Sequence, residues 1–281
     1  MKVTAESVKR LRDRTGVSMG KCKEALEQAG GDEEKAIDVL RKAGIASAVK
    51  KEGRDANEGL IGFAESDKAV AVIEVNSETD FVAQNETFKQ FIKDICLQAA
   101  ELQISSVEEL LKQPYSKDKS ITLDQQRALI MQSLGENIQV KRIAIIPKES
   151  SKSVGLYSHM GGKIVTAVVL LGASGHELLA REIAMHTAAE APDYLKPEEV
   201  PSEVRAREED IAKAQIQGKP ADIVDKIVAG KIKAFYDQVC LLGQKFVKDN
   251  SLSIAEVVAA EAKKTGVPLS VESFIRWKVG G

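Results

Sequence analysis

Apolar positions at the amino terminus recur at the spacing of three short amphipathic helices. Each predicted helix has a polar residue that can cap its start and a glycine that can end it: Thr4, Ser18 and Asp32 at the starts, Gly16, Gly30 and Gly44 at the ends. Three helices in so short a stretch bury little apolar surface. Residues 1–48 are therefore predicted to form a docking module rather than an enzyme domain.

The pattern then changes to that of a strand pair followed by helices. A charged linker is expected at 49–58, and a β-hairpin follows with its turn at Glu65–Lys68. A helix is predicted from about Gln84, with these residues on its inner face: Phe88, Phe91, Ile92, Ile95, Ala99 and Leu102. Two helical stretches, 107–112 and 123–134, and a strand at 137–146 complete a predicted subdomain, 59–148.

The same order of elements returns in residues 149–281. A strand pair flanks a Gly161-Gly162 turn, a helix spans 176–190, and a last strand is expected at 272–279. Between them, residues 192–238 are predicted to form a helical-hairpin arm: a charged helix at 203–217, a turn at 218–220 and a helix at 221–238. The chain is thus expected to be α+β, with two related subdomains that contain small antiparallel sheets.

Composition narrows the classes of function. The formal net charge is -2, from 40 basic and 42 acidic residues, so the chain lacks the positive excess that nucleic acid attracts. Cys22, Cys96 and Cys240 form no C-x-x-C pair, which favours reduced thiols in a cytoplasmic protein over a disulfide framework or zinc site. The start has no signal-peptide pattern, and no run of 18 apolar residues occurs, so export and membrane insertion are not expected.

Two segments superficially resemble anion-binding loops. Gly16–Cys22 has three residues between its glycines where a phosphate-binding loop needs four, and Cys22 replaces the hydroxyl that would hold Mg²⁺. A turn between helices is the favoured interpretation. Gly172–Glu177 follows a strand and opens a helix, but it lacks the third glycine of a dinucleotide site, so an ordinary loop is favoured.

The histidines offer no catalytic constellation. His159, His176 and His186 are not spaced as a helical metal pair, and no serine nucleophile motif accompanies them. His186 is expected to be buried and hydrogen-bonded, whereas His159 is expected to be exposed beside a glycine turn. We therefore predict no catalytic residue, no cofactor and no metal site.

The segment NSETDFVAQNETF, Asn76–Phe88, places an aromatic residue in a polar loop. Pattern alone favours a structural role, in which Thr79 or Asp80 caps the helix and Phe81 lies on its inner face, seven residues before Phe88. The alternative is that Asp80 and Phe81 protrude as an acid-plus-ring pair, the composition of a protein–protein hot spot.

Several motifs in the same order resemble the elongation factor Ts family, the guanine-nucleotide exchange factors of bacterial elongation factor Tu. They are LRDRTGVSMGKCKEAL, GDEEKAIDVLRKAG, EVNSETDFVA, GENIQVKR, IAMHTAA and FIRWKVG. The resemblance implies an amino-terminal domain like a ubiquitin-associated (UBA) domain, a linker, two α+β core subdomains and a helical arm. It also favours the protruding interpretation of Phe81.

The resemblance further implies which residues contact elongation factor Tu. The segment Thr79, Asp80, Phe81 and Val82 would enter its GTP-binding domain and disturb the Mg²⁺ site, promoting GDP release and GDP/GTP exchange. Further docking contacts are implied for Arg12, Met19, Lys51, Leu134 and His159. Whether the complex dimerises stays open.

Two other functions remain as alternatives. A non-catalytic scaffold would bind a partner through the amino-terminal helices without affecting nucleotide, and Phe81 would then belong to the core. An unrecognised enzyme would have to use His159 or the Gly172 loop.

Overall fold

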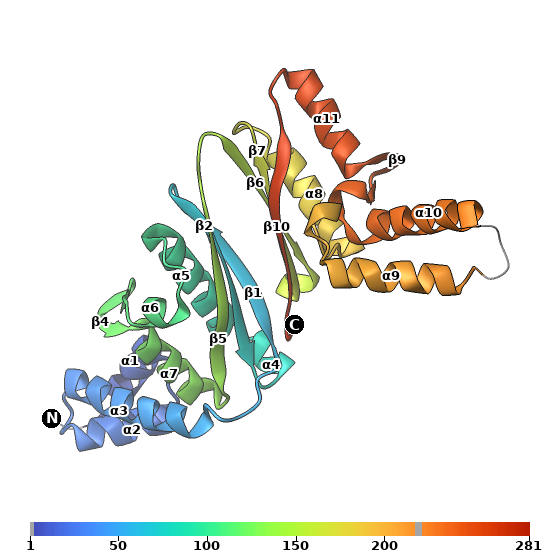
Figure 1. The fold of residues 1–281 in the computed structure, drawn as a ribbon. Coiled ribbons are helices and arrows are strands. Elements are labelled where there is room, and N and C mark those ends of the chain that lie inside the picture. The colour runs from blue at the N-terminus through green and yellow to red at the C-terminus, as the bar shows by residue number, and fades with distance from the viewer. Residues whose placement is uncertain (1–2, 217–220) are drawn as a thin grey trace. The chain divides into compact units, whose positions relative to one another are not determined.

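The computed structural model describes residues 3–216 and 221–281, and its chain forms two compact units (Figure 1). Unit 1 comprises Met1–Lys148, Gly161–Lys163 and Lys278–Gly281. Unit 2 comprises Glu149–Met160 and Ile164–Trp277.

Unit 1 begins with the three predicted helices, α1 (Ala5–Thr15), α2 (Met19–Gln28) and α3 (Glu33–Lys51). The Thr4 side chain accepts the Ser7 N–H as the cap of α1, and the Asp32 side chain accepts the Lys35 N–H as the cap of α3. The helices enclose a small core of fully or nearly fully buried side chains, among them Leu11, Cys22, Leu26, Ala36 and Leu40.

The predicted end of the third helix at Gly44 is wrong, because α3 continues for seven more residues to Lys51. Glycine inside a helix costs roughly 1 kcal/mol relative to alanine. Here Gly44 is buried against α7 (Leu123–Leu134): a Cβ at this position would lie 3.5 Å from Leu129 Cδ2. Close packing between α3 and α7 outweighs the local preference for a break.

The sheet of unit 1 has the order β1-β2-β5 and is antiparallel throughout. The strands are β1 (Glu58–Glu65), β2 (Ala69–Ser77) and β5 (Ile138–Pro147). β2 lies in the centre and is buried along its whole length. Helix α5 (Glu86–Leu102) packs against β1 and β2, which confirms the predicted hairpin and helix (Figure 1).

The remaining elements of unit 1 are short. They are α4 (Asp80–Ala83), α6 (Val107–Leu111), β3 (Pro114–Tyr115) and β4 (Asp118–Thr122). The β3–β4 hairpin was not predicted. Leu102, expected on the inner face of α5, is 49% exposed because it is the last helical residue before left-handed Gln103 ends the helix.

Unit 2 repeats the predicted arrangement, with an antiparallel β6–β7 pair in a sheet of order β10-β7-β6. These strands are β6 (Lys152–His159), β7 (Ile164–Leu171) and β10 (Ser270–Lys278). Helix α8 (Glu177–Glu190) packs on β6 so closely that a Cβ on Gly155 would lie 2.0 Å from the Arg181 nitrogen. No side chain fits there without moving the helix.

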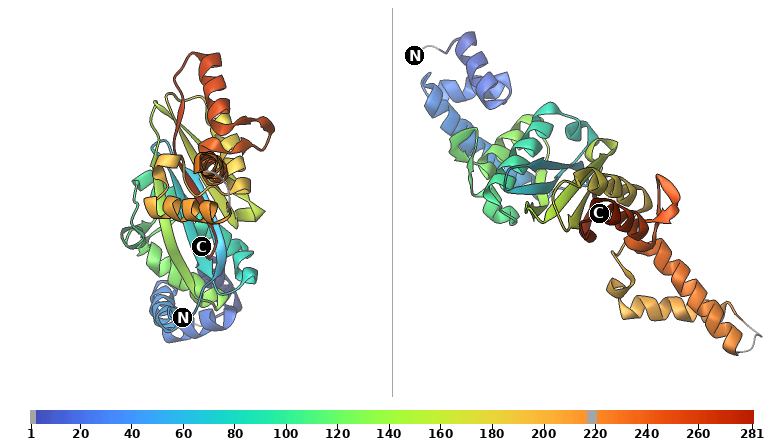
Figure 2. Two further views of the ribbon diagram at one scale, coloured as in Figure 1. Left: turned by 45° about the vertical axis from the view of Figure 1, so that its right-hand side comes forward. Right: turned by 90° about the horizontal axis from the view of Figure 1, so that it is seen from above.

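The arm of unit 2 consists of α9 (Ser202–Ala214) and α10 (Ala221–Val239), which lie side by side (Figures 1 and 2). A small core of its own joins the two helices through Ala212, Val228 and Ile232. The predicted turn at 218–220 lies outside the described residues. The structure also has elements after the arm that were not predicted: β8 (Lys245–Phe246), β9 (Asp249–Ser253) and α11 (Ile254–Thr265).

None of the helices formed by residues 3–216 and 221–281 combines the length and apolar character that crossing a membrane requires.

Candidate functional site

Phe81 projects from the single turn of α4, directly after the central strand of unit 1. Its exposed fraction is 85%, the largest among the exposed large apolar side chains of the described residues. The interpretation of Phe81 as a core residue is therefore wrong. The helix does not run continuously to Phe88, because Gln84 ends α4 and Asn85 caps α5, so the seven-residue spacing no longer places both rings on one face.

The turn that carries Phe81 is held on both sides. Val82 and Ala83 are buried in the core of unit 1, with exposed fractions of 8% and 0%. Asn85 N–H donates to the Val82 carbonyl at 2.9 Å, and the Ser77 hydroxyl donates to the Thr79 carbonyl at 2.9 Å. Phe81 is thus an exposed ring on an ordered backbone.

Two glutamates join this turn to the loop between α7 and β5. Glu136 accepts the Thr79 hydroxyl at 2.6 Å through Oε1 and the Thr79 N–H at 3.0 Å through Oε2. In the other direction, Glu78 Oε1 accepts the Asn137 N–H at 2.6 Å. We call these four residues, Glu78, Thr79, Glu136 and Asn137, the carboxylate clasp. Hydrogen bonds to a charged acceptor are stronger than neutral ones, so the clasp fixes where the turn begins.

The carboxyl end of α7 beside the clasp attracts two lysines. Lys51 Nζ donates to the Met131 carbonyl at 2.9 Å, and Lys21 Nζ donates to the Gln132 carbonyl at 3.4 Å. Cations at this end complement the helix dipole and the terminal carbonyls of the helix. Burial, followed by the charges of Arg54 and Lys21, lowers the pKa of Lys51, while Glu78 and Glu136 oppose that shift.

The predicted docking residues fall in three places. Lys51 and half-buried Leu134 lie around the α7–β5 loop near Thr79. Arg12 and Met19 are exposed on α1 and α2, and the loop between those helices contacts α7, since the Ser133 hydroxyl donates to the Gly16 carbonyl at 2.6 Å. His159 belongs to unit 2.

His159 is exposed, as predicted, at the end of β6. Its ring stacks on Tyr157 with centroids 6.1 Å apart, and the Tyr157 hydroxyl lies 3.4 Å from Nδ1. Contact of any of these five residues with a partner stays a prediction.

The sequence offered no signal for the clasp. Thr79 and Glu136 are 57 positions apart, so no local pattern connects them. Glu136 lies within the GENIQVKR motif, but no role was assigned to it there.

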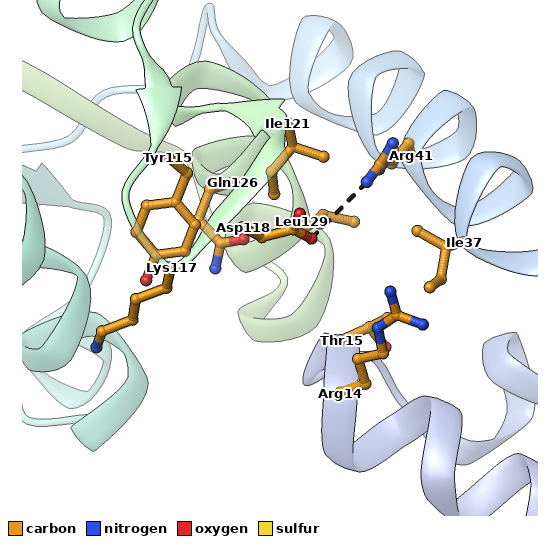
Figure 3. A pocket seen from close by; sticks show the side chains of 10 residues that line it. All are labelled: Arg14, Thr15, Ile37, Arg41, Tyr115, Lys117, Asp118, Ile121, Gln126 and Leu129. Carbon is orange, nitrogen blue, oxygen red and sulfur yellow. Dashed lines mark ion pairs between the residues drawn. The ribbon is translucent and has the colours of Figure 1, made fainter. Parts of the chain in front are cut away.

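Unit 1 also has a recess formed by α1, α3, β3–β4 and α7 (Figure 3). Its three cationic side chains already have acidic neighbours. Arg14 pairs with Glu34 at 2.6 Å and Lys117 with Asp94 at 2.7 Å. Arg41 Nη2 lies 3.8 Å from Asp118 Oδ2, the ion pair drawn in Figure 3. The recess therefore presents compensated charge rather than a ready site for an anion.

Within the described parts of the chain, no group of three or more His, Cys, Asp or Glu side chains is arranged to hold a metal ion. Residues 16–18 form the predicted turn between helices, Met19–Cys22 begin α2, and residues 172–176 form a loop between β7 and α8.

His186, predicted to be buried, is fully buried in unit 2 and satisfied at both ring nitrogens. Val247 N–H donates to Nδ1 at 3.3 Å, which leaves the proton on Nε2 to donate to Gln244 Oε1 at 3.0 Å. Burial lowers the pKa of His186, opposed by the Gln244 hydrogen bond and the Glu190 charge. The folded chain therefore keeps this ring neutral.

This neutral histidine should make unit 2 less stable in acid. The folded pKa lies below the ordinary value of 6.5, so the unfolded chain binds the proton more readily below that pH. The contribution of the neutral His186 ring to the free energy of unfolding should be complete above pH 6.5. It should decline as the pH falls toward the folded pKa, with a slope of at most about 1.4 kcal/mol per pH unit. Urea unfolding followed by Trp277 fluorescence between pH 5 and pH 8 measures it, because Trp277 belongs to unit 2.

An NMR titration of the His186 ring provides the control. A ring that titrates at or above pH 6.5 would contradict this account.

Comparison with known proteins identifies the family. The model of the family described as Elongation factor TS matches residues 78–281. The chain is 58% identical to elongation factor Ts of Protochlamydia amoebophila (strain UWE25), covering 99% of each chain. It is 44% identical to the elongation factor Ts proteins of Chlamydia muridarum (strain MoPn / Nigg) and Chlamydia pneumoniae, covering 98% of each chain. The chain therefore belongs to the elongation factor Ts family of translation elongation factors.

Proposed function

We propose that this chain promotes GDP release and GDP/GTP exchange on elongation factor Tu by inserting Thr79–Val82 into its GTP-binding domain and disturbing the Mg²⁺ site. The observation that carries the proposal is the 85% exposed ring of Phe81 on a turn anchored by buried neighbours. Membership of the elongation factor Ts family supports the choice of partner.

An exposed phenylalanine on an ordered turn is suited to binding. Burying a side chain of this size stabilises a complex by roughly 1.5–3 kcal/mol. Because the turn is already held by Val82, Ala83 and Thr79, little further ordering is required when it binds. Aromatic anchors of this kind dominate protein–protein interfaces.

The effect on nucleotide follows from linkage. A factor that binds nucleotide-free elongation factor Tu more tightly than the GDP-bound form must weaken GDP binding by the same ratio. Each tenfold weakening requires about 1.4 kcal/mol of differential contact. No covalent bond changes, so the chain would act as an exchange factor rather than as an enzyme.

The Mg²⁺ site is a sensitive target for such contacts. Mg²⁺ requires nearly ideal octahedral geometry at 2.0–2.1 Å from its ligands. If an inserted ring slightly displaced the elements that carry the Mg²⁺ ligands, binding of the ion would weaken. Binding of the nucleotide phosphates would weaken with it. Asp80, exposed beside Phe81, would add a carboxylate to the inserted segment.

The other contacts would orient the partner on this site. We assign that role to Arg12, Met19, Lys51, Leu134 and His159. Lys51 already donates to the Met131 carbonyl, so its replacement would also loosen α3 from α7.

An equilibrium experiment separates exchange from passive binding. The affinity of the chain for elongation factor Tu is measured by calorimetry for the nucleotide-free and the GDP-bound partner. An exchange factor should bind the nucleotide-free form at least about 100-fold more tightly, which is a coupling free energy of about 2.7 kcal/mol. Equal affinities for the two forms would support the scaffold instead.

A further inference from the structure

We propose that Glu136 and its counterpart Glu78 are positioning residues for exchange: through the carboxylate clasp they hold the Phe81 turn in its binding conformation before the partner arrives. This inference rests on the proposed function. Neither glutamate needs to contact the partner, because Glu136 acts through the hydroxyl and N–H of Thr79, and Glu78 acts through the N–H of Asn137.

Glu136 determines the orientation of the Thr79 side chain. The Thr79 hydroxyl donates its proton to Glu136 Oε1 at 2.6 Å, which leaves an oxygen lone pair to accept the Val82 N–H at 3.4 Å. The carboxylate thus aligns the residue that caps α4. A helix of four residues cannot maintain itself, because forming the first turn is unfavourable without outside contacts.

The clasp also reaches the end of the amino-terminal helices. Buried Asn137 donates from Nδ2 to the Arg54 carbonyl at 2.8 Å and the Glu52 carbonyl at 3.4 Å. Arg54 Nη1 lies 3.4 Å from Glu78 Oε1. The four clasp residues therefore contact both the Phe81 turn and the segment that follows Lys51.

This arrangement gives the clasp a function beyond stability. If the turn were loose, the exposed ring would sample many positions, and binding would have to restrict them. With the clasp in place, that ordering is completed during folding. Its loss should lower the population of chains that present Phe81 correctly, and the apparent activity should fall in proportion.

The variant that tests this is Glu136→Gln. Glutamine keeps the shape but has only one accepting atom, so either the hydroxyl or the N–H of Thr79 loses its acceptor. The matched control is Glu256→Gln, which alters a carboxylate that accepts the Ser253 N–H at 2.6 Å as part of the cap of α11 in unit 2.

Two measurements are made on the full chain. Hydrogen–deuterium exchange of a peptide covering residues 77–85 should be about tenfold faster in Glu136→Gln, equivalent to about 1.4 kcal/mol of lost protection. At concentrations of the variant well below saturation, the rate of GDP release from elongation factor Tu should fall by a similar factor. Glu256→Gln should change neither, and the thermal midpoint of Glu136→Gln should stay within a few degrees of the parent.

A double-mutant cycle with Phe81→Ala shows whether Glu136 acts through the ring. In the Phe81→Ala background, Glu136→Gln should have little further effect on release. Full additivity, unchanged protection of residues 77–85, or undiminished release by Glu136→Gln would each overturn the inference. If Phe81→Ala alone retained full activity, the proposed function would fail. The hydrogen–deuterium exchange of residues 77–85 would still decide whether the clasp orders the turn.

Discussion

Replacing Phe81 by alanine should leave the chain folded and lower its acceleration of GDP release from elongation factor Tu by about 30- to 900-fold. The estimate corresponds to a hot-spot loss of about 2–4 kcal/mol. Folding should be unaffected because the ring is 85% exposed and contributes little to the core. Stopped-flow release of a fluorescent GDP measures the activity, and circular dichroism on heating measures the fold.

Phe88→Ala is the matched control. Phe88 lies seven residues later, on α5, and its side chain is fully buried in the core of unit 1. Its truncation should lower the free energy of unfolding by about 3–5 kcal/mol. The account would be wrong if Phe81→Ala unfolded as readily as Phe88→Ala, or if it stayed folded and kept full exchange activity.

Replacing Glu74 by alanine should lower the free energy of unfolding of unit 1 by about 3 kcal/mol. Glu74 is fully buried on the central strand β2, where its Oε2 receives Arg142 Nε at 2.7 Å and Nη2 at 2.6 Å. Its Oε1 accepts Asn76 Nδ2 at 3.2 Å and the Gly280 N–H at 3.1 Å. Removing Glu74 takes the carboxylate away from Arg142, and breaking a buried ion pair in this way typically costs about 3–5 kcal/mol. The lower value is expected because the Arg142 side chain is 31% exposed and is therefore only partly removed from water.

Glu65→Ala on the neighbouring strand β1 provides the comparison. Glu65 pairs with Lys148 at 2.9 Å, but its side chain is 54% exposed. Surface pairs of this kind contribute at most about 1 kcal/mol. Chemical denaturation of both variants should therefore separate them by about 2 kcal/mol or more, and equal losses would contradict the role assigned to burial.

Structure that depends on neighbours along the chain could be predicted from the sequence. The caps at Thr4 and Asp32 and the stop at Gly16, which adopts a φ of 69°, follow from residue type and position alone. The two strand pairs follow from apolar runs separated by turn residues.

Structure that depends on segments far apart in the sequence could not be predicted in this way. Gly44 continues a helix because α7 packs against it, and no local pattern reports that contact. The exposure of Phe81 has a local cause instead: a second cap at Asn85 starts a new helix, although the spacing of Phe81 from Phe88 fits a single helical face. The clasp depends on residues 57 positions apart, which only the folded sheet brings together.

Release of fluorescent GDP from purified elongation factor Tu, with catalytic amounts of this chain in excess unlabelled nucleotide, tests whether Asp80 and Phe81 drive exchange. We expect fast release with the parent chain and little acceleration with a folded Asp80→Ala/Phe81→Ala variant. Release no faster with the parent chain than without it, or equally fast with the double variant, would show that Asp80 and Phe81 do not drive exchange.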